Sequence, residues 1–325
     1  MHHARSDASP VMMASARTQL GVGKLQQAKH HRQRGFTLVE MIVAITLMGL
    51  LSVMAAPLLR IPMVAWMDAS RRAELGISAD VLQSKLASDL GRALPNSVRV
   101  QSVGGRTFLE YLEVRAQGRH RAGTVAAPQA CPAVCVAPGG QDMLEAGCAE
   151  TCFTSLGPLL GDPPVPGVDW VVVNPLSPVG ALGNPYLGGN IAVAGGIKVR
   201  LQNTAAATDG VRLRHAAHSY PATSASRRFY LVASPVTYEC NPGTQRVLRH
   251  SGYAISAVQP VVFPGATSVP VTTNLAACSM RYTPAGAGNR GGVVSAWFRL
   301  SRIASDTGAA ESLETNGQWA VSETP

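Results

Sequence analysis

Residues 36–56 read FTLVEMIVAITLMGLLSVMAA, and this stretch decides the fold. It holds 21 residues with a single charged side chain, Glu40. As an α-helix it would extend about 30 Å, which matches the hydrocarbon core of a bilayer. The sequence therefore predicts a transmembrane helix over residues 36–59.

The basic residues of the chain gather before this span. Residues 1–35 hold six Lys and Arg and one acid, Asp7, so they supply 6 − 1 = +5 of the formal net charge of +9. A basic cluster beside an apolar span indicates a cytoplasmic flank. The rest of the chain shows no basic stripe interleaved with aromatic residues, so we expect no nucleic acid partner. We interpret residues 1–35 as a basic leader, with Met12 or Met13 as alternative start sites.

An ordinary cleavable signal peptide is the alternative interpretation of the span. Residues 53–56 (VMAA) offer a small-residue cleavage site. However, Pro57 would directly follow that cut, and the apolar run exceeds the roughly 7–15 residues of a signal h-region. Both features favour a retained helix.

Glu40 lies one turn inside the apolar span. A carboxylate there costs on the order of 2–3 kcal/mol on insertion, so it normally has a partner or a role. Cleavage after Gly35 would give Phe36 a free amino group, in the same subunit or in a neighbour of a helical array. That cation would neutralise the carboxylate and set the register of the helices, because an unpaired buried ion is strongly penalised. The alternative is an interfacial Glu40 that reaches water.

Residues 34–40 read RGFTLVE, and with the apolar stretch that follows they resemble the class III signal of type IV pilins and type II secretion pseudopilins. The resemblance implies that a prepilin peptidase cleaves after Gly35 and methylates the new N-terminal Phe36. It implies that Glu40 acts in assembly. It also implies a helix bend at Pro57, where many members of the family have a proline.

A second helical pattern follows the span. Apolar residues recur there at spacings of three or four, which makes one apolar face: Leu75, Ala79, Leu82, Leu86 and Leu90. We expect this face to pack on a core rather than to form a partner groove. Because Pro95 excludes the helical conformation from the residue before it, the helix should end at Leu94. The sequence predicts one helix from about Phe36 to Leu94, amphipathic over residues 60–95.

Residues 96–325 read as a β-rich head. Runs typical of strands are residues 108–114, 170–173, 197–201, 229–232, 236–239, 253–258, 293–300 and 319–321. Connections rich in Gly, Pro and Ala separate them, notably residues 116–168, 174–196 and 260–275. The predicted fold class is α+β: a long N-terminal helix, transmembrane in its first half, packed on an antiparallel β-sheet head, as in pilins.

Segments of the head resemble one branch of this family. They are residues 94–99 (LPNSVR), 227–232 (RRFYLV), 235–240 (PVTYEC) and 277–282 (ACSMRY). These are similar to the MshO type of minor pilin in mannose-sensitive haemagglutinin (MSHA) pilus biogenesis, and more loosely to the J-type minor pseudopilins of type II secretion. The resemblance implies a minor pilin that takes part in assembly of a type IV pilus. Because the head is bulky for a filament repeat, we expect a place at or near the tip.

The partners and location follow from that resemblance. It implies association with other major and minor pilins, the prepilin peptidase, the inner-membrane assembly platform and membrane lipid. It also implies a single inner-membrane pass with a cytoplasmic N terminus and a periplasmic head, and then a place in a pilus or pseudopilus. The alternatives are a minor pseudopilin of a type II secretion system, or a tip adhesin whose cysteine-containing loop binds a surface ligand.

All six cysteines follow the span, which favours disulfides in an oxidising compartment. They are Cys131, Cys135, Cys148, Cys152, Cys240 and Cys278. We expect Cys240 to pair with Cys278, on either side of a predicted strand at 253–258, which would contribute about 3–4 kcal/mol. The first four form C-x3-C-x12-C-x3-C within the loop 116–168. Two disulfides or a zinc site fit that spacing, and disulfides suit the periplasm better.

Motifs of catalysis are missing from the sequence. It contains no G-x-S-x-G, Walker or H-E-x-x-H pattern. His215 and His218 lie beside arginines in a polar segment, so we interpret them as solvated loop residues. We expect no catalytic residues, no metal and no cofactor. A periplasmic enzyme with a signal peptide is a weaker alternative, and it predicts a mature N terminus near Pro57.

Overall fold

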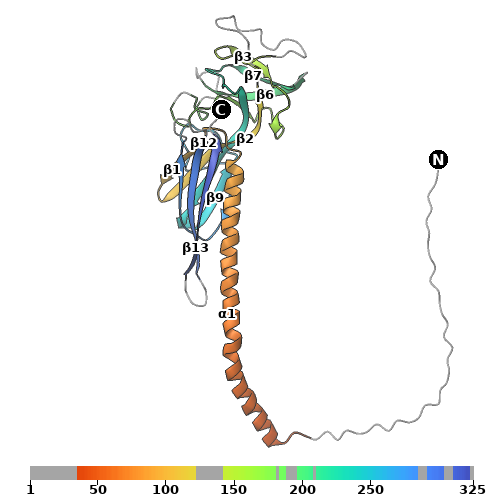
Figure 1. Ribbon diagram of the computed structural model, residues 1–325, viewed down its shortest axis with the longest axis vertical. Helices are drawn as coiled ribbons and strands as arrows, with labels where there is room; N and C mark the ends of the chain where they lie inside the picture. Colours follow the sequence, from red (N-terminus) through yellow and green to blue (C-terminus); the bar gives the residue numbers. More distant parts are fainter. Residues whose placement is uncertain are drawn as a thin grey trace, which may run out of the picture. The chain divides into compact units, whose positions relative to one another are not determined.

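The computed structural model describes residues 35–121, 142–180, 183–187, 196–207, 210–284, 291–303 and 310–322. The leader, residues 1–34, lies outside these ranges. Contacts between residues divide the chain into two units, Met1–Pro62 and Met63–Pro325. One helix, α1 (Leu38–Leu90), crosses the boundary between them (Figure 1). The N-terminal unit contains the apolar half of α1, and the second unit contains the amphipathic half and the strands.

The described strands lie after α1 and range from 2 residues in β4 to 14 residues in β2 and β8. In chain order they are β1 (Arg99–Val103), β2 (Arg106–Arg119), β3 (Ala149–Thr154), β4 (Leu160–Gly161), β5 (Trp170–Val173), β6 (Lys198–Ala207), β7 (Gly210–Ser219), β8 (Arg228–Asn241), β9 (Arg246–Ser251), β10 (Thr267–Thr272), β11 (Leu275–Thr283), β12 (Gly291–Ile303) and β13 (Ala310–Ser322). A single turn of 3₁₀-helix, Pro242–Thr244, joins β8 to β9. The chain is therefore one apolar helix followed by an antiparallel β-sheet head, which is the predicted α+β, pilin-like fold class.

Within the described residues the strands form two sheets, of ten and of three strands. The larger sheet follows the order β1-β2-β8-β5-β6-β7-β3, with β4 on β2, β9 on β8 and β10 on β9. Its central strand is β8, whose first half pairs with β5 and whose second half pairs with β9, while β2 pairs along its other edge. The smaller sheet has the order β11-β12-β13. All these strand pairs are antiparallel, and short connections join β1 to β2, β6 to β7 and β8 to β9.

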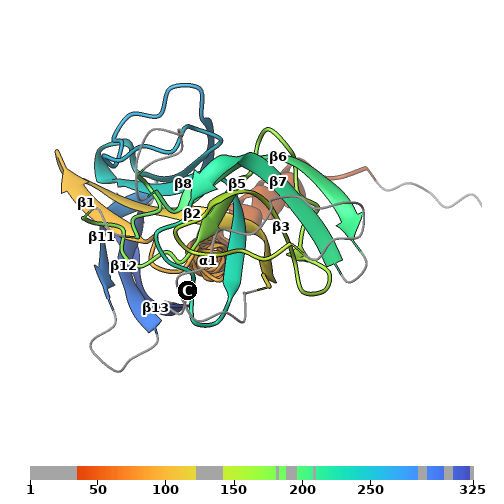
Figure 2. The same cartoon turned by 90° about the horizontal axis from the view of Figure 1, so that it is seen from above.

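The second half of α1 packs on the head through the predicted apolar stripe. The five members of the stripe are at most 5% exposed: Leu75, Ala79, Leu82, Leu86 and Leu90. They share one core with Tyr111 of β2, Tyr238 of β8 and Phe298 of β12. Figure 2 looks along α1 and shows strands of both sheets around it. Each buried leucine contributes about 1.5–3 kcal/mol, so this stripe holds the helix on the head.

A buried carboxylate adds a polar clamp at the end of α1. The side chain of Asp89 is fully buried, and Arg249 of β9 donates to it from Nε at 2.6 Å. The Tyr238 hydroxyl donates at 2.8 Å and Lys85 Nζ lies at 3.0 Å. Burial acts to raise the pKa of Asp89, but these donors outweigh burial and lower the pKa to about 2. Asp89 therefore remains ionised and joins the helix to the sheet.

The helix ends four residues before the predicted Leu94. It stops at Leu90, because the following segment pairs with β2. The Leu94 N–H donates to the Leu112 carbonyl at 2.8 Å, and the Val114 N–H donates to the Arg92 carbonyl at 2.9 Å. These backbone groups are therefore used by the sheet before Pro95 is reached.

Two predicted strands, 229–232 and 236–239, are one continuous strand. Both lie in β8, although Pro235 between them has no N–H to donate. The β2–β8 ladder shifts register between Leu112 and Val114, opposite this point. A register shift of this kind accommodates a proline within a strand.

The predicted strand at 253–258 is wrong. Gly252 turns the chain at the end of β9 with a φ of +80°, and residues 252–266 form a loop. Side chains anchor this loop instead of a ladder. Arg99 donates to the carbonyls of Ser256 and Ala257 at 2.9 and 2.8 Å, and the Tyr253 hydroxyl bonds to Thr237 Oγ1 at 2.6 Å. Hydrogen bonds from side chains therefore hold this loop in place of strand pairing.

The long connections that the sequence predicts contain strands. The stretch 116–168 includes the end of β2, all of β3 and the two residues of β4. The stretch 260–275 includes β10. β3 was missed because its sequence, AETCFT, lacks a run of β-branched residues, and β10 (TSVPVT) because a proline interrupts it. These segments are strands because each of them pairs with a neighbouring strand of the sheet.

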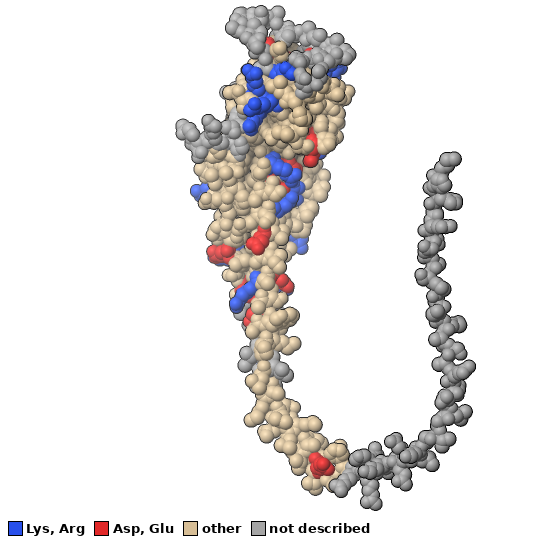
Figure 3. All heavy atoms as spheres, turned by 45° about the vertical axis from the view of Figure 1, so that its right-hand side comes forward, with Lys and Arg blue, Asp and Glu red and all other residues tan. Residues whose placement is uncertain are grey.

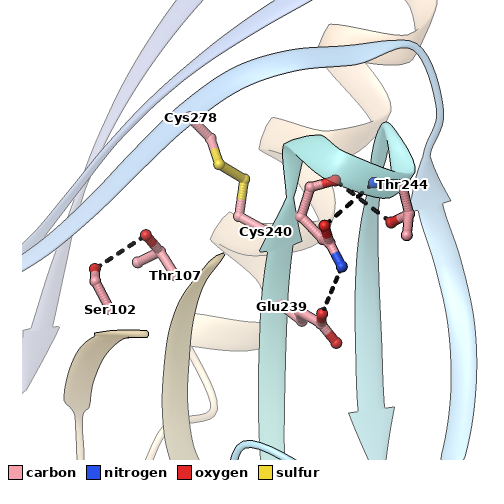
Figure 4. The surroundings of a disulfide bond; sticks show 7 residues. Ser102, Thr107, Glu239, Cys240, Thr244 and Cys278 are labelled. Carbon is pink, nitrogen blue, oxygen red and sulfur yellow. Dashed lines mark hydrogen bonds between the residues drawn. A yellow bond between two sulfur atoms is a disulfide. The ribbon is translucent and has the colours of Figure 1, made fainter. Parts of the chain in front are cut away.

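A disulfide joins the two sheets (Figure 4). It links Cys240 at the end of β8 to Cys278 in β11. The Cα atoms of the two residues lie 6.5 Å apart. Because β8 and β11 belong to different sheets, the bond holds the smaller sheet against the larger one.

Removing this disulfide should destabilise the head. The bond closes a loop with a sequence separation of 38, so a Cys240→Ala/Cys278→Ala variant should lose about 3–4 kcal/mol of unfolding free energy. Urea unfolding of the full chain in non-ionic detergent, followed by near-ultraviolet circular dichroism, measures this loss. A loss below about 1 kcal/mol would contradict the expected constraint on the unfolded chain.

Candidate functional site

The N terminus of α1 begins with a side-chain cap. Thr37 precedes the first helical residue, and its Oγ1 accepts the N–H of Glu40 at 3.2 Å. The Thr37 carbonyl accepts the Met41 N–H at 3.1 Å, which is the first bond of the helix. Thr37 is therefore an N-cap and Glu40 is the third helical residue. This also explains why the helix starts at Leu38 rather than at the predicted Phe36.

Sequence reasoning missed the cap, although its signal was present. The order Thr37-Leu38-Val39-Glu40 has the spacing of a capping box, in which a threonine and an acid three residues later satisfy the first turn of a helix. A carboxylate at this position also interacts favourably with the positive end of the helix dipole. Glu40 is thus placed where a helix tolerates an acid best.

The peptide bond between Gly35 and Phe36 lies just outside the helix. Gly35, Phe36 and Thr37 have no regular secondary structure, and both Gly35 and Phe36 are exposed. A Cβ added at Gly35 would meet no atom within 4 Å. A protease acting here would find an open segment followed at once by a capped helix.

The first half of α1 exposes apolar side chains all round. Leu38–Ala55 is long and apolar enough to cross a membrane, with a mean hydropathy of 2.3, and none of it is buried. Figure 3 shows the nearly uncharged surface of this part of the helix. A continuous apolar surface of this kind belongs in lipid or against other helices. This segment fits a single-pass membrane anchor.

Glu40 interrupts this apolar surface as its one ionisable side chain. Among the described residues it forms no ion pair, and its side chain is exposed. By contrast, the Thr46 hydroxyl is satisfied inside the helix, because it donates to the Ile42 and Val43 carbonyls at 3.0 and 2.9 Å. The oxygens of the Glu40 carboxylate can therefore accept hydrogen bonds from a group outside the segment described.

The predicted bend at Pro57 stays a prediction. α1 is continuous in its backbone through both Pro57 and Pro62. A proline inside a helix removes one backbone hydrogen bond, so each site weakens the helix locally. The boundary between the two units of the chain falls at Pro62.

Two of the four cysteines predicted to staple the 116–168 stretch are described. Cys148 and Cys152 are both disulfide-bonded, so their sulfurs are not available as thiolate ligands. Cys131 and Cys135 lie outside the described residues, and the connectivity of this group stays a prediction.

The histidines expected in a solvated loop are buried instead. His215 and His218 lie on β7 and are 2% and 9% exposed. Burial lowers the pKa of His215 to about 4, so the ring is neutral near pH 7. Its Nδ1 lies 2.8 Å from the Ala216 carbonyl, and His218 Nε2 lies 2.8 Å from the Gly196 carbonyl. Because a carbonyl only accepts, both nitrogens carry protons, and the histidines act as donors within the sheet.

Comparison with known protein families gives one match at the N terminus. A family model described as the prokaryotic N-terminal methylation motif covers residues 30–56. That range includes Gly35, Phe36, Thr37, Glu40 and most of the apolar half of α1. No curated protein and no solved structure matches the chain. The match therefore concerns the leader junction and the span.

The motif and the fold agree. Residues 30–56 carry the methylation motif of a type IV pilin-like prepilin signal, and an antiparallel β head follows the apolar helix. The motif implies association with other pilins and with a prepilin peptidase. This chain is thus pilin-like, and its methylation motif supports a pilin or pseudopilin family with a role in pilus or secretion assembly.

Proposed function

We propose that this chain is a non-catalytic minor pilin that assembles at or near the tip of a type IV pilus of the MSHA kind. The observation that carries the proposal is the open Gly35–Phe36 segment in front of a capped apolar helix with one acid, Glu40. The head segments that resemble the MshO type of minor pilin support the assignment to the MSHA kind of pilus. A minor pseudopilin of type II secretion is the alternative that shares this N terminus.

The mechanism follows from charge and burial. Cleavage after Gly35 converts an amide nitrogen of Phe36 into an amine. In an apolar helix bundle this cation neutralises Glu40 of the same or a neighbouring subunit, and helices out of register leave both ions unpaired. The head then remains outside the bundle, and its size suits an end of the filament. Other major and minor pilins and the inner-membrane assembly platform are the partners in this scheme.

The proposed location has two supports. The basic leader, with +5 of net charge, suits the cytoplasmic side of the inner membrane. The Cys240–Cys278 disulfide suits an oxidising compartment such as the periplasm on the other side. We therefore place the N terminus in the cytoplasm and the head in the periplasm before assembly.

The mature N terminus tests this proposal directly. Mass spectrometry of the protein from cells that contain a prepilin peptidase should find N-methylated Phe36. A Gly35→Val variant should remain uncleaved. Because a Cβ at Gly35 meets no atom within 4 Å, that loss would reflect recognition by the peptidase rather than misfolding.

Gly49→Ala is the matched control. Gly49 lies in the same helix, and its added Cβ also meets no atom within 4 Å, so cleavage should be unchanged. A mature N terminus near Pro57 would overturn the proposal in favour of an exported protein with an ordinary signal peptide.

A further inference from the structure

A groove crosses the head where β2, β4 and β8 meet the turn after α1. It consists of two adjacent hollows of about 390 and 200 Å³, which share Gln117, Leu160 and Arg228 as lining residues. Four arginines line it, and we call it the arginine groove: Arg92, Arg115, Arg119 and Arg228. All of its lining residues belong to the second unit of the chain.

Two of these arginines face each other across the sheet. Arg119 of β2 is the direct antiparallel partner of Arg228 of β8. Side chains opposite each other in this way lie on the same face of a sheet about 5 Å apart at Cβ, and like charges there are destabilising. Neither arginine forms an ion pair with a carboxylate among the described residues. Arg228 also hydrogen-bonds the Tyr230 side chain, but no carboxylate among the described residues balances the two arginines, so the pair concentrates positive charge.

The other two arginines are already neutralised. Arg115 Nε lies 3.0 Å from Asp169 Oδ1. Arg92 lies 3.1 Å from Glu113 Oε1. The excess charge of the groove is therefore located at Arg119 and Arg228.

The backbone beside the groove has a fixed shape. Gly161 of β4 has a φ of +119°, and a Cβ there would lie 2.3 Å from the Arg115 carbonyl oxygen. Only glycine allows β4 to approach β2 this closely. Its neighbour Leu160 remains 65% exposed, and Leu156 is 40% exposed. The groove thus offers apolar side chains beside the two arginines.

These features point to one class of ligand. Sugar and nucleic acid sites usually offer exposed aromatic faces, but the aromatic residue lining this groove, Tyr230, is 2% exposed. Carboxylates bind guanidinium groups through paired, charge-assisted hydrogen bonds. Exposed leucines next to them suit apolar side chains of a peptide rather than a free anion.

We propose that the arginine groove binds an acidic segment of another protein chain. One carboxylate lies between Arg119 and Arg228, and an apolar side chain of the same segment packs on Leu160. The inference goes beyond the assembly role of the helix. It depends on residues of the head alone, so it stands or falls separately from cleavage at Gly35.

A peptide of alternating Glu and Leu, labelled with fluorescein, tests the groove. Fluorescence anisotropy with the full chain in non-ionic detergent should show binding. The Arg119→Gln/Arg228→Gln variant should bind at least about tenfold more weakly, because charge-assisted hydrogen bonds are lost. The same peptide with Gln in place of Glu should bind the unaltered protein with a similar loss.

A matched variant controls for net charge. Arg246 and Arg281 are exposed arginines outside the groove, so Arg246→Gln/Arg281→Gln removes the same charge and should leave peptide binding unchanged. The melting temperature supplies a second readout. Removing Arg119 and Arg228 should leave it unchanged or raise it, since the like charges repel.

Four outcomes would overturn the inference. One is equal loss of binding in the two double variants, which would mean general electrostatic attraction. Another is equal binding of the Glu and Gln peptides. The third is a lower melting temperature for Arg119→Gln/Arg228→Gln, which would show that the pair stabilises the fold. A sulfated oligosaccharide that displaces the Glu peptide and binds more tightly would instead assign the groove to polyanionic sugars, which also contradicts it.

Discussion

Replacing Glu40 with alanine should nearly abolish incorporation of this protein into filaments while cleavage after Gly35 continues. In the variant the Phe36 amine has no carboxylate partner inside the apolar bundle. An unpaired charge there costs at least about 2–3 kcal/mol, which corresponds to a loss of roughly 30–150-fold in an assembly equilibrium. The measurement is the amount of protein in sheared filaments relative to membranes, with the N terminus checked by mass spectrometry.

The neutral variant Glu40→Gln separates charge from hydrogen bonding. It keeps the shape of the side chain and should fail in the same way, because the amine still lacks a counter-charge. Thr46→Val is the matched control in the same span. Among the residues that the structure describes, Thr46 bonds only to carbonyls of its own helix, so its loss should leave incorporation unchanged. Normal incorporation of Glu40→Ala would contradict the pairing of Glu40 with the Phe36 amine.

Replacing Asp89 with alanine should give the largest loss of stability of any single substitution considered. Arg249, only 17% exposed, would keep only its longer contact of 3.7 Å with Glu113, and the Tyr238 hydroxyl would lose its acceptor. Breaking a buried ion pair costs about 3–5 kcal/mol. We expect about 3 kcal/mol, because Lys85 and Arg92 are 42% and 49% exposed and can turn to water. Urea unfolding in detergent measures this loss.

Asp80→Ala on the same helix is the matched control. Asp80 is exposed and forms no ion pair among the described residues, so its loss should change the unfolding free energy by less than about 0.5 kcal/mol. If both variants unfolded at the same urea concentration, the clamp at Asp89 would contribute nothing.

The ionised Asp89 of this clamp also makes the unfolding free energy of the head sensitive to acid. The pKa of Asp89 is lowered from 3.8 to about 2 in the folded chain, so the folded state holds its proton less tightly than the unfolded state. This stabilisation is present above the unfolded pKa near 3.8 and is lost as the pH falls toward about 2. A shift of this size corresponds to about 2 kcal/mol. In Asp89→Ala this part of the pH dependence should be missing.

The two halves of α1 show why helices were easier to predict than strands. The stripe from Leu75 to Leu90 repeats every three or four residues, and that period depends only on the helix itself. The end of the helix at Leu90 was harder, because it depends on pairing of Leu94 with Leu112 eighteen residues later. The run 253–258 looks like a strand and is a loop for the same reason. None of the described strands pairs with it, and Arg99 binds its Ser256 and Ala257 carbonyls.

Burial of polar residues was equally hard to predict. His215 looks like a solvated residue because it stands beside arginines in the chain, and nothing in the sequence around Asp89 indicates that it is buried. Their partners, Arg249 and the Ala216 carbonyl, show that each is fixed within the folded head. Arg119 and Arg228 likewise stand 109 residues apart in the sequence and meet only through the β2–β8 register.

The sequence by itself determined the methylation motif over residues 30–56 and the apolar span with its one acid, Glu40. These features are local, because cleavage, membrane insertion and helix capping each involve residues within one or two turns of each other. Only the tertiary structure decided the helix end, the strand order, the Asp89 clamp and the arginine groove. Each of them depends on which distant segments pair. The periodicity of the sequence within one strand does not show which other strand it will pair with.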